Sequence, residues 1–216
     1  MAQYLFKSSP TIAAHCVKGC QRASTVHRHH TIYQGGIALT IEFELCRDAR
    51  LLGQYYGLRE RCFRRELGLP DFDGDEDERD RSGHILIARS GQRCVGGARI
   101  APGAAIDYQL DELGLVADFC CMWERFVVDP AVRSIQLMRQ FCAYLIEMSR
   151  QFGYHHALVL SSLRNARFYR ACHSALGVDF RIHRSVPDCA QGPFQNLEHY
   201  LSVSHLVDDA LCQVAA

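Results

Sequence analysis

One segment in the middle of the chain, Met122–Pro130, constrains the fold more than any other part of the sequence. Its run of aromatic and β-branched residues predicts a strand, and the Asp-Pro pair at its end cannot continue a ladder of backbone hydrogen bonds. Glu124 and Arg125 place two opposite charges inside this otherwise apolar segment. Because an unpaired charge on a buried strand is costly, each of them needs a partner or a function. We therefore predict a central strand whose charge partners come from the chain on either side.

Length and composition predict a soluble protein with one sizeable domain. The chain has 216 residues, of which 48% are hydrophobic and 22% are charged, and this is enough for a single hydrophobic core. The formal net charge is zero, with 24 basic and 24 acidic residues, so a dedicated nucleic-acid-binding protein is not expected. No apolar run reaches the length of about 18 residues that a membrane-spanning helix needs, and no signal peptide is recognisable.

Eleven cysteines raise the question of disulfides or a zinc site. Most of them lie in apolar runs, where cysteine packs as a small hydrophobic residue. Cys16 and Cys20 are not followed by a second pair at the spacing of a zinc site. We expect free thiols in the reducing cytoplasm and no metal site.

The first 36 residues are expected to form an N-terminal arm, and residues 37–216 the folded domain. The arm contains the basic run His27–His30 and a Gly-Gly pair, but it has no sustained hydrophobic periodicity. No carboxylate or cysteine accompanies these histidines at close spacing. A solvated arm is therefore favoured over a metal site.

Hydrophobic periodicity predicts an alternation of strands and helices in the rest of the chain. The expected strands are residues 37–45, 84–88, 94–100, 122–130, 157–160, 179–182 and 199–203, and the expected helices are residues 51–67, 135–153 and 163–176. This order is typical of a mixed-sheet α/β sandwich and not of a repeating βαβ array.

Charged residues recur on elements that are otherwise apolar. Arg59 lies on the apolar face of the first predicted helix, one turn before Phe63, and Arg99 lies within a predicted strand. Snorkelling of Arg59 to the surface is the alternative to a buried role.

An acidic loop between residues 70 and 80 offers partners for these arginines. It contains Asp77 and Asp80, and it resembles a calcium-binding loop except that Ser82 stands where the closing glutamate is required. Ordinary surface ion pairs are the alternative to one shared site. The groups predicted to pair around one site are Arg59, Arg99, Arg125, Asp77, Asp80 and Glu124.

Four short motifs occur in a characteristic order along the chain. They are Leu58-Arg59-x-x-x-Phe63 ahead of Glu66-Leu67-Gly68, then Asp77-x-x-Asp80, then Gly97–Pro102, and finally Arg125–Asp129. Together they resemble the autoinducer synthases that make acyl-homoserine lactones, within the acetyltransferase-like (GNAT) superfamily. The similarity extends from about Ile37 to His205. It implies a GNAT-like α/β/α sandwich with a mixed sheet and a V-shaped cleft at the central strand.

The resemblance also implies an activity. Such enzymes are N-acyltransferases that move an acyl chain from acyl carrier protein to the amine of S-adenosylmethionine, which gives a quorum-sensing signal. Acyl carrier protein and a small-molecule amine are then the expected partners, with no separate cofactor. Relatives that use coenzyme A hold its pyrophosphate on a glycine-rich loop before the next helix. Residues 132–137 contain no glycine, which favours acyl carrier protein as the donor.

Two departures from the family pattern keep the acceptor open. The family's tryptophan, six residues after Phe63, is Leu69 here, and its strand reads Glu-x-Ser-Arg-Phe, so the acid has moved from position 122 to Glu124. A free amino acid is therefore the alternative acceptor, which would give an N-acyl amino acid. A third alternative is an inactive GNAT-like binding module.

The expected roles follow from this chemistry. Glu124 would deprotonate the acceptor amine, or would instead be the ion-pair partner of Arg99 or Arg125. Backbone N–H groups of a β-bulge near Phe126 and Val127 would bind the thioester oxygen. The expected catalytic residues are Glu124, Arg125, Phe126 and Val127. The expected substrate-binding residues are Arg59, Phe63, Asp77, Asp80, Arg99, Trp123 and Phe141.

Two surfaces are expected to contact the acyl donor. The acyl chain would lie among Trp123, Phe141, Leu145, Leu158 and Leu160, for which ordinary core packing is the alternative. Acyl carrier protein is acidic, so a basic docking face is expected. Arg164, Arg167 and Arg170 recur every three residues along one side of the predicted helix 163–176, and Arg133 and Arg139 offer a second basic patch. An ordinary solvated helix face is the alternative for either patch.

Overall fold

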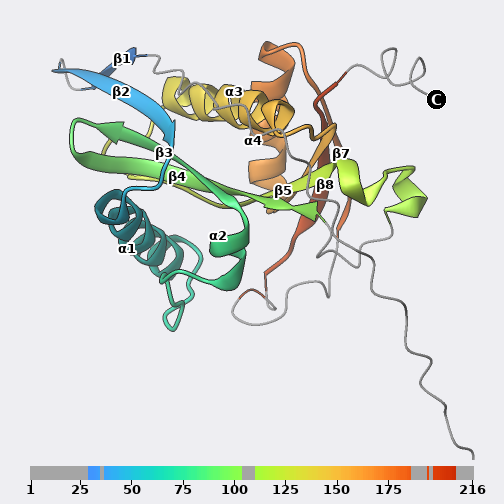
Figure 1. The fold of residues 1–216 in the computed structure, drawn as a ribbon, viewed down its shortest axis with the longest axis horizontal. Coiled ribbons are helices and arrows are strands. Elements are labelled where there is room, and N and C mark those ends of the chain that lie inside the picture. The colour runs from blue at the N-terminus through green and yellow to red at the C-terminus, as the bar shows by residue number, and fades with distance from the viewer. Residues whose placement is uncertain (1–28, 35–36, 104–109, 186–193, 195–196, 208–216) are drawn as a thin grey trace, which may run out of the picture.

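A mixed eight-stranded sheet forms the middle layer of the molecule, in the order β1-β2-β3-β4-β5-β6-β8-β7 (Figure 1). The computed structural model describes residues 29–34, 37–103, 110–185, 194 and 197–207. The strands are β1 (His29–Gln34), β2 (Ile37–Leu45), β3 (His84–Ser90), β4 (Arg93–Pro102), β5 (Cys120–Val128), β6 (His156–Ser161), β7 (Asp179–Ser185) and β8 (Tyr200–His205). Only β5 and β6 run parallel within the described ladders; every other neighbouring pair is antiparallel.

Helices cover both faces of this sheet. On one side lie α1 (Ala49–Glu66) and the short α2 (Glu78–Ser82), and on the other lie α3 (Ile135–Gln151) and α4 (Leu163–Ala175) (Figure 1). The longer helices begin at residues whose side chains accept a hydrogen bond from the first turn, namely Asp48, Ser134 and Ser162. The predicted mixed-sheet α/β/α sandwich is confirmed.

The predicted strands and helices all occur, with ends that differ by at most three residues. Besides the short 3-10 helices η2 (Asp111–Leu113) and η3 (Ala117–Phe119), one described α-helix and one described strand were not predicted. One is α2, inside the acidic loop. The other is β1, which lies within the segment expected to be an arm and pairs with β2, with His30 opposite Ile41. The His30 ring packs edge-on against Tyr144 of α3. The rest of the expected arm, including His27, lies outside the described residues.

The sheet opens at β5, the strand at which the family resemblance implies a V-shaped cleft. Parallel pairing of β5 with β6 runs from Cys120 opposite His156 to Trp123 opposite Val159. Beyond Trp123, β5 continues to Val128 and pairs only with β4 on its other side. The two parallel strands therefore part after Trp123, and the charged segment of β5 begins at the next residue.

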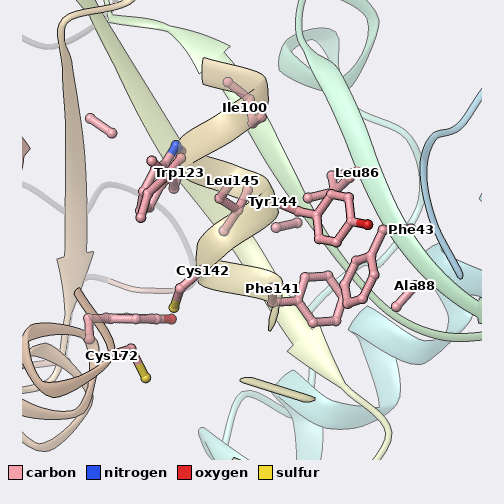
Figure 2. Packing of buried hydrophobic residues seen from close by; sticks show 14 of the residues in the cluster. Phe43, Leu86, Ala88, Ile100, Trp123, Phe141, Cys142, Tyr144, Leu145 and Cys172 are labelled. Carbon is pink, nitrogen blue, oxygen red and sulfur yellow. The ribbon is translucent and has the colours of Figure 1, made fainter. Parts of the chain in front are cut away.

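The largest core lies between the sheet and the α3–α4 layer. Phe141 and Tyr144 of α3 pack against Phe43 of β2, with ring centroids 4.9 and 4.4 Å apart, respectively (Figure 2). Trp123 joins the same core: its indole N–H donates to Ser149 Oγ at 2.9 Å. Alternation along β5 and β6 therefore gives each face of the sheet its own apolar cluster.

The side chains expected to surround the acyl chain are divided between these two faces. Trp123, Phe141 and Leu145 are buried in the α3–α4 core. Leu158 and Leu160 project from β6 to the opposite face, where they pack with Met122 of β5. These five side chains therefore do not line one common space, and core packing accounts for all of them.

Replacing Ser149 by alanine tests the buried polar contact in the larger core. Ser149 is fully buried and accepts the Trp123 indole N–H, so its loss leaves that donor unpaired and should lower the free energy of unfolding by about 1–3 kcal/mol. Urea denaturation of the wild type and the variant measures the difference. The matched control is Ser202→Ala, because Ser202 is equally buried and its hydroxyl has no hydrogen-bond partner among the described residues. Equal effects of the two substitutions would contradict this assignment.

Candidate active site

Arg59 fixes the acidic loop against α1. The side chain lies on the buried face of α1 and is 1% exposed. Its Nε donates to Gly74 O at 3.0 Å, and its two terminal nitrogens donate to the Asp80 carboxylate at 3.1 and 2.9 Å. Gly74 reaches this position because the loop passes very close to α1: a Cβ at Gly74 would lie 2.4 Å from the Cβ of Glu60. The snorkelling alternative for Arg59 is therefore wrong.

Arg99 is the most completely paired cation of the site. It projects from β4, is 1% exposed, and donates to Asp80 at 2.8 Å, to Asp77, and to Glu124 at 2.8 Å. Burial alone would lower the pKa of Arg99, but these three carboxylates outweigh it and raise the pKa above its ordinary value. Arg99 is therefore a permanent buried cation.

Asp77 and Asp80 reach Arg99 because they form the cap of α2. The Asp80 N–H donates to Asp77 Oδ1 at 2.9 Å, and the Asp77 N–H donates to Asp80 Oδ2 at 3.0 Å, which is a capping box. Partial burial acts to raise the pKa of Asp77, but the hydrogen bond from Arg99 and the charges of Arg99 and Arg125 bring it down to about 2. Both carboxylates thus face inward, as the sequence predicted.

A β-bulge interrupts β5 directly after the point where β6 departs. Gly97 of β4 is opposite Val127, whereas Arg99 is opposite Glu124, so two residues of β5 face one of β4. Arg125 has a φ of 56°, in the left-handed region that residues with a Cβ rarely adopt. Because of the bulge, Glu124 and Arg125 both project toward the α1–α2 side, where simple alternation would have separated them.

Glu124 is held by two arginines through one oxygen. Its Oε2 accepts from Arg99 Nε at 2.8 Å and from Arg79 Nε at 3.0 Å. Arg79 was not predicted; the available signal was its position on α2, next to Asp80. The geometry favours the ion-pair role of Glu124, because both arginines donate to its Oε2. Its other oxygen, Oε1, takes part in neither bond.

Arg125 is the least compensated cation of the group. Its nearest ion-pair contact is with Asp77, at 3.9 Å, and its buried Nε has no hydrogen-bond partner among the described residues. Burial, followed by repulsion from Arg99, lowers the pKa of Arg125. The linked ion pairs join four guanidinium groups, of Arg59, Arg79, Arg99 and Arg125, to three carboxylates. The linked group therefore carries one more positive charge than negative charges.

Three phenylalanines form an aromatic wall beside Arg125. Phe63 of α1 contacts Phe72 and Phe194, with ring centroids 4.9 and 5.9 Å away. The Arg125 guanidinium lies 4.6 Å from the centre of the Phe194 ring and 5.4 Å from that of Phe72. Phe63 was predicted to belong to the site, whereas Phe72 and Phe194 were not. These rings stand close to the helix end where the family pattern has a tryptophan and this chain has Leu69.

The remaining predicted site residues lie next to the bulge or in the core between the sheet and the α3–α4 layer. Val127 packs toward α1, and the Phe126 ring packs on the other face, 5.1 Å from the Phe141 ring. Trp123 and Phe141 are buried in the α3–α4 core. No group of three or more histidine, cysteine, aspartate or glutamate side chains in the described ranges is arranged to hold a metal ion.

The turn between β5 and α3 is closed by its own side chains. Asp129 Oδ1 accepts from the Ala131 N–H at 2.9 Å, and Ser134 Oγ accepts from the Leu137 N–H at 3.1 Å. Arg133 is held by Glu66 in two hydrogen bonds of 2.9 and 2.8 Å. The turn therefore uses several of the donors that a pyrophosphate would need.

A comparison with known protein families identifies the family of this chain. The model of the acetyltransferase (GNAT) family matches residues 52–173, more than half of the chain. The chain belongs to the GNAT family. The match extends from α1 through most of α4, so it includes the ion pairs, the bulge and the turn before α3.

Solved structures share the GNAT fold at low sequence identity. The acyl-homoserine lactone synthase LasI is 16% identical, with a TM-score of 0.56, over 83% of this chain and 92% of that chain. The coenzyme-A-dependent acyl-homoserine lactone synthase BjaI, solved with MTA, is 19% identical, with a TM-score of 0.56, over 87% of each chain. An aminoglycoside 6'-acetyltransferase is 14% identical, with a TM-score of 0.53, over 77% of this chain and 97% of that chain. At these identities the similarity shows the fold alone.

No curated protein sequence matches the chain. Within the described part of this GNAT chain, none of the helices combines the length and the apolar character that crossing a membrane requires.

Replacing Glu124 by glutamine tests its role in the ion pairs. The substitution keeps the shape but removes one of the carboxylates that neutralise buried Arg99, so the free energy of unfolding should fall by about 1–3 kcal/mol, as measured by urea denaturation at neutral pH. The control is Glu76→Gln, which removes an exposed ion pair with Arg81 and should change stability by about 0.5 kcal/mol or less. An unchanged stability with a large loss of turnover would show instead that Glu124 acts as the base.

Proposed function

We propose that this GNAT protein is an N-acyltransferase that moves an acyl chain from acyl carrier protein to the amine of S-adenosylmethionine, producing an acyl-homoserine lactone signal. The observation that carries the proposal is the bulge at Arg125–Phe126, which lies where β5 parts from β6 and directly beside the buried ion pairs. A donor thioester at this opening would meet an acceptor held on the α1–α2 side. The activity belongs in the cytoplasm, where the free cysteines of the described segments would stay reduced.

The chemistry is direct attack of the acceptor amine on the thioester. In the acyl transfer a C–N bond forms, the thioester C–S bond breaks, and the thiol leaves with the proton that the amine gives up. With S-adenosylmethionine as acceptor, the lactone then closes when a carboxylate oxygen attacks the γ-carbon: a C–O bond forms, the bond from that carbon to the sulfonium sulfur breaks, and methylthioadenosine leaves. Backbone N–H groups of the bulge stabilise the oxyanion that develops on the acyl carbonyl. Glu124 Oε1 orients the amine or a water that carries its proton away. Direct transfer needs no covalent acyl-enzyme.

Arg125 is the proposed anchor for the acceptor's carboxylate. It carries the uncompensated charge of the site, and its side chain is partly exposed. A guanidinium binds a carboxylate through charge-assisted hydrogen bonds, which are stronger than neutral ones. S-adenosylmethionine presents a carboxylate next to its amine, so a contact between its carboxylate and Arg125 would bring the amine close to Glu124.

A free amino acid is the second candidate acceptor, because it carries the same amine and carboxylate. Two features favour it: Leu69 replaces the family's tryptophan, and apolar Met122 occupies the position of the family's acid. Met122 is buried, and its sulfur accepts from Arg79 at 3.7 Å. The product would then be an N-acyl amino acid.

Acyl carrier protein is the proposed donor on account of the turn before α3. The turn contains no glycine and already uses donors at Ala131 and Leu137 internally. Since BjaI is a coenzyme-A-dependent synthase of similar fold, the fold by itself does not select the donor. The docking face would be on α4, where Arg164, Arg167 and Arg170 are exposed; Arg133 is already paired with Glu66.

Mass spectrometry of reactions with purified protein tests the activity. Acyl-carrier-protein and coenzyme-A thioesters of the same chain are each supplied with S-adenosylmethionine or with an amino-acid mixture. We expect a homoserine lactone product and a catalytic efficiency at least about 10-fold higher with acyl carrier protein. Better turnover with coenzyme A would overturn the proposed donor, and an N-acyl amino acid would select the second candidate. No product with any pair would leave the inactive binding module.

Arg125→Gln tests the carboxylate anchor. Loss of a charge-assisted contact should raise KM for the acceptor by about 10- to 100-fold. The methyl ester of the acceptor should be an equally poor substrate for the wild type and the variant, because it lacks the group that Arg125 binds. Arg81→Gln, at an exposed ion pair on the same helix as Arg79, is the matched control and should leave KM unchanged. If the substitution raises KM for the methyl ester as much as it raises KM for the free acid, Arg125 does not bind the carboxylate.

A further inference from the structure

Tyr55 of α1 makes a hydrogen bond to the bulge that the reaction scheme above does not use. Its hydroxyl donates to the Arg125 carbonyl oxygen at 2.9 Å. The side chain is 0% exposed, and burial raises the pKa of Tyr55 well above its usual range. The hydroxyl therefore stays protonated at every pH at which the protein works, and it remains a donor.

The Tyr55 ring is fixed on the strand that faces the bulge. A Cβ at Gly97 of β4 would lie 2.5 Å from Tyr55 Cδ2 and 2.7 Å from its Cε2, so the ring lies directly on the backbone there. Gly97 is the residue at which the β4–β5 register shifts. A glycine at this position is what allows a helix side chain to reach across β4 to the bulge of β5.

The bulge needs such support because its conformation is unfavourable by itself. Among the described residues, Arg125 is the one non-glycine residue with a positive φ. In this left-handed backbone conformation, the Cβ lies too close to the following carbonyl oxygen. The β4 ladder pairs neither Arg125 nor Phe126. The hydrogen bond from Tyr55 therefore supplies an attachment that the sheet does not.

Holding the Arg125 carbonyl also sets the direction of the next N–H group. The peptide between Arg125 and Phe126 is trans, like all peptide bonds of the described residues, so its N–H points away from its C=O. Because Tyr55 draws the carbonyl toward α1, the Phe126 N–H is directed away from α1. It lies on the stretch of β5 that β6 no longer pairs with, where the acyl carbonyl would be bound.

We propose that Tyr55 is a positioning residue for acyl transfer: it locks the bulge so that the Phe126 N–H can donate to the thioester oxygen. This inference rests on the proposed acyl-transfer function and adds a residue outside the four motifs that suggested it. Tyr55 acts through the backbone and touches no substrate. Its contribution should therefore appear in the chemical step and not in acceptor binding.

Tyr55→Phe removes the hydroxyl and keeps the ring against Gly97. Direct loss of an oxyanion donor lowers kcat by about 10²- to 10³-fold; misdirecting one through the backbone should lower it by about 10- to 100-fold. KM for the acceptor should change by less than about 3-fold, because the ion pairs remain. Tyr56→Phe is the matched control, since the Tyr56 hydroxyl has no hydrogen bond within the described segments and its ring keeps its contact with Arg59; its kcat should equal that of the wild type.

Two further measurements separate positioning from packing. Installing 4-aminophenylalanine at position 55 returns a donor to the same place and should restore most of kcat, even where Tyr55→Phe is too unstable to assay. In the folded Tyr55→Phe protein, the Phe126 amide should show a changed chemical shift and faster hydrogen exchange by NMR.

The outcomes distinguish this inference from the proposed function. Wild-type protein without acyl transfer would overturn the function, and the amide signal of Phe126 would still report whether Tyr55 holds the bulge. Wild-type kcat and an unchanged Phe126 amide in Tyr55→Phe would overturn the role of Tyr55. A lower kcat that 4-aminophenylalanine does not restore would assign Tyr55 to packing alone and would likewise overturn it.

Discussion

The buried charge of Arg99 is the constraint on which the rest of the site depends. A guanidinium that is 1% exposed is tolerable only if carboxylates surround it, because desolvation of an unpaired charge costs several kcal/mol. Those carboxylates come from the start of α2 and from β5, which are far apart in the chain. Neutralising Arg99 therefore requires the acidic loop to fold over the sheet, and Arg59 holds that loop from the other side.

The bulge of β5 connects this electrostatic centre to the opening in the sheet. It turns Glu124 and Arg125 to the same face, so that one completes the pairing of Arg99 and the other is left with an unmatched charge. It also leaves Arg125 and Phe126 without a register partner on β4, beside the point where β6 departs. The bulge thus provides both an anion-binding group and a candidate oxyanion site. The strand has no glycine at this point, and we infer that the hydrogen bond from Tyr55 stabilises the bulge.

Much of the fold and the membership of the site could be predicted because both leave local traces in the sequence. Alternation and helical periodicity report which residues are buried, and they located the strands, the longer helices and the central position of β5. Arg59, Arg99 and the two aspartates were predictable for a related reason: charges on apolar elements must find partners. The departures at Leu69 and Met122 also came from the sequence, since they are differences in residue type.

Only the tertiary structure decided which groups meet. The strand β1 has no alternation of apolar and polar residues, and it is defined by its pairing with β2. The sequence around Arg79 does not distinguish it from an exposed helix residue, and only the packing of α2 against the sheet brings it to Glu124. The left-handed conformation of Arg125 is set by its neighbours, because nothing in an Arg-Phe pair encodes a bulge. The sequence by itself determined which residues are buried and which charges need partners, since burial depends on local pattern. The partners, the direction of the Phe126 N–H and the role of Tyr55 were decided by long-range packing, because each depends on segments that come together only in the folded chain.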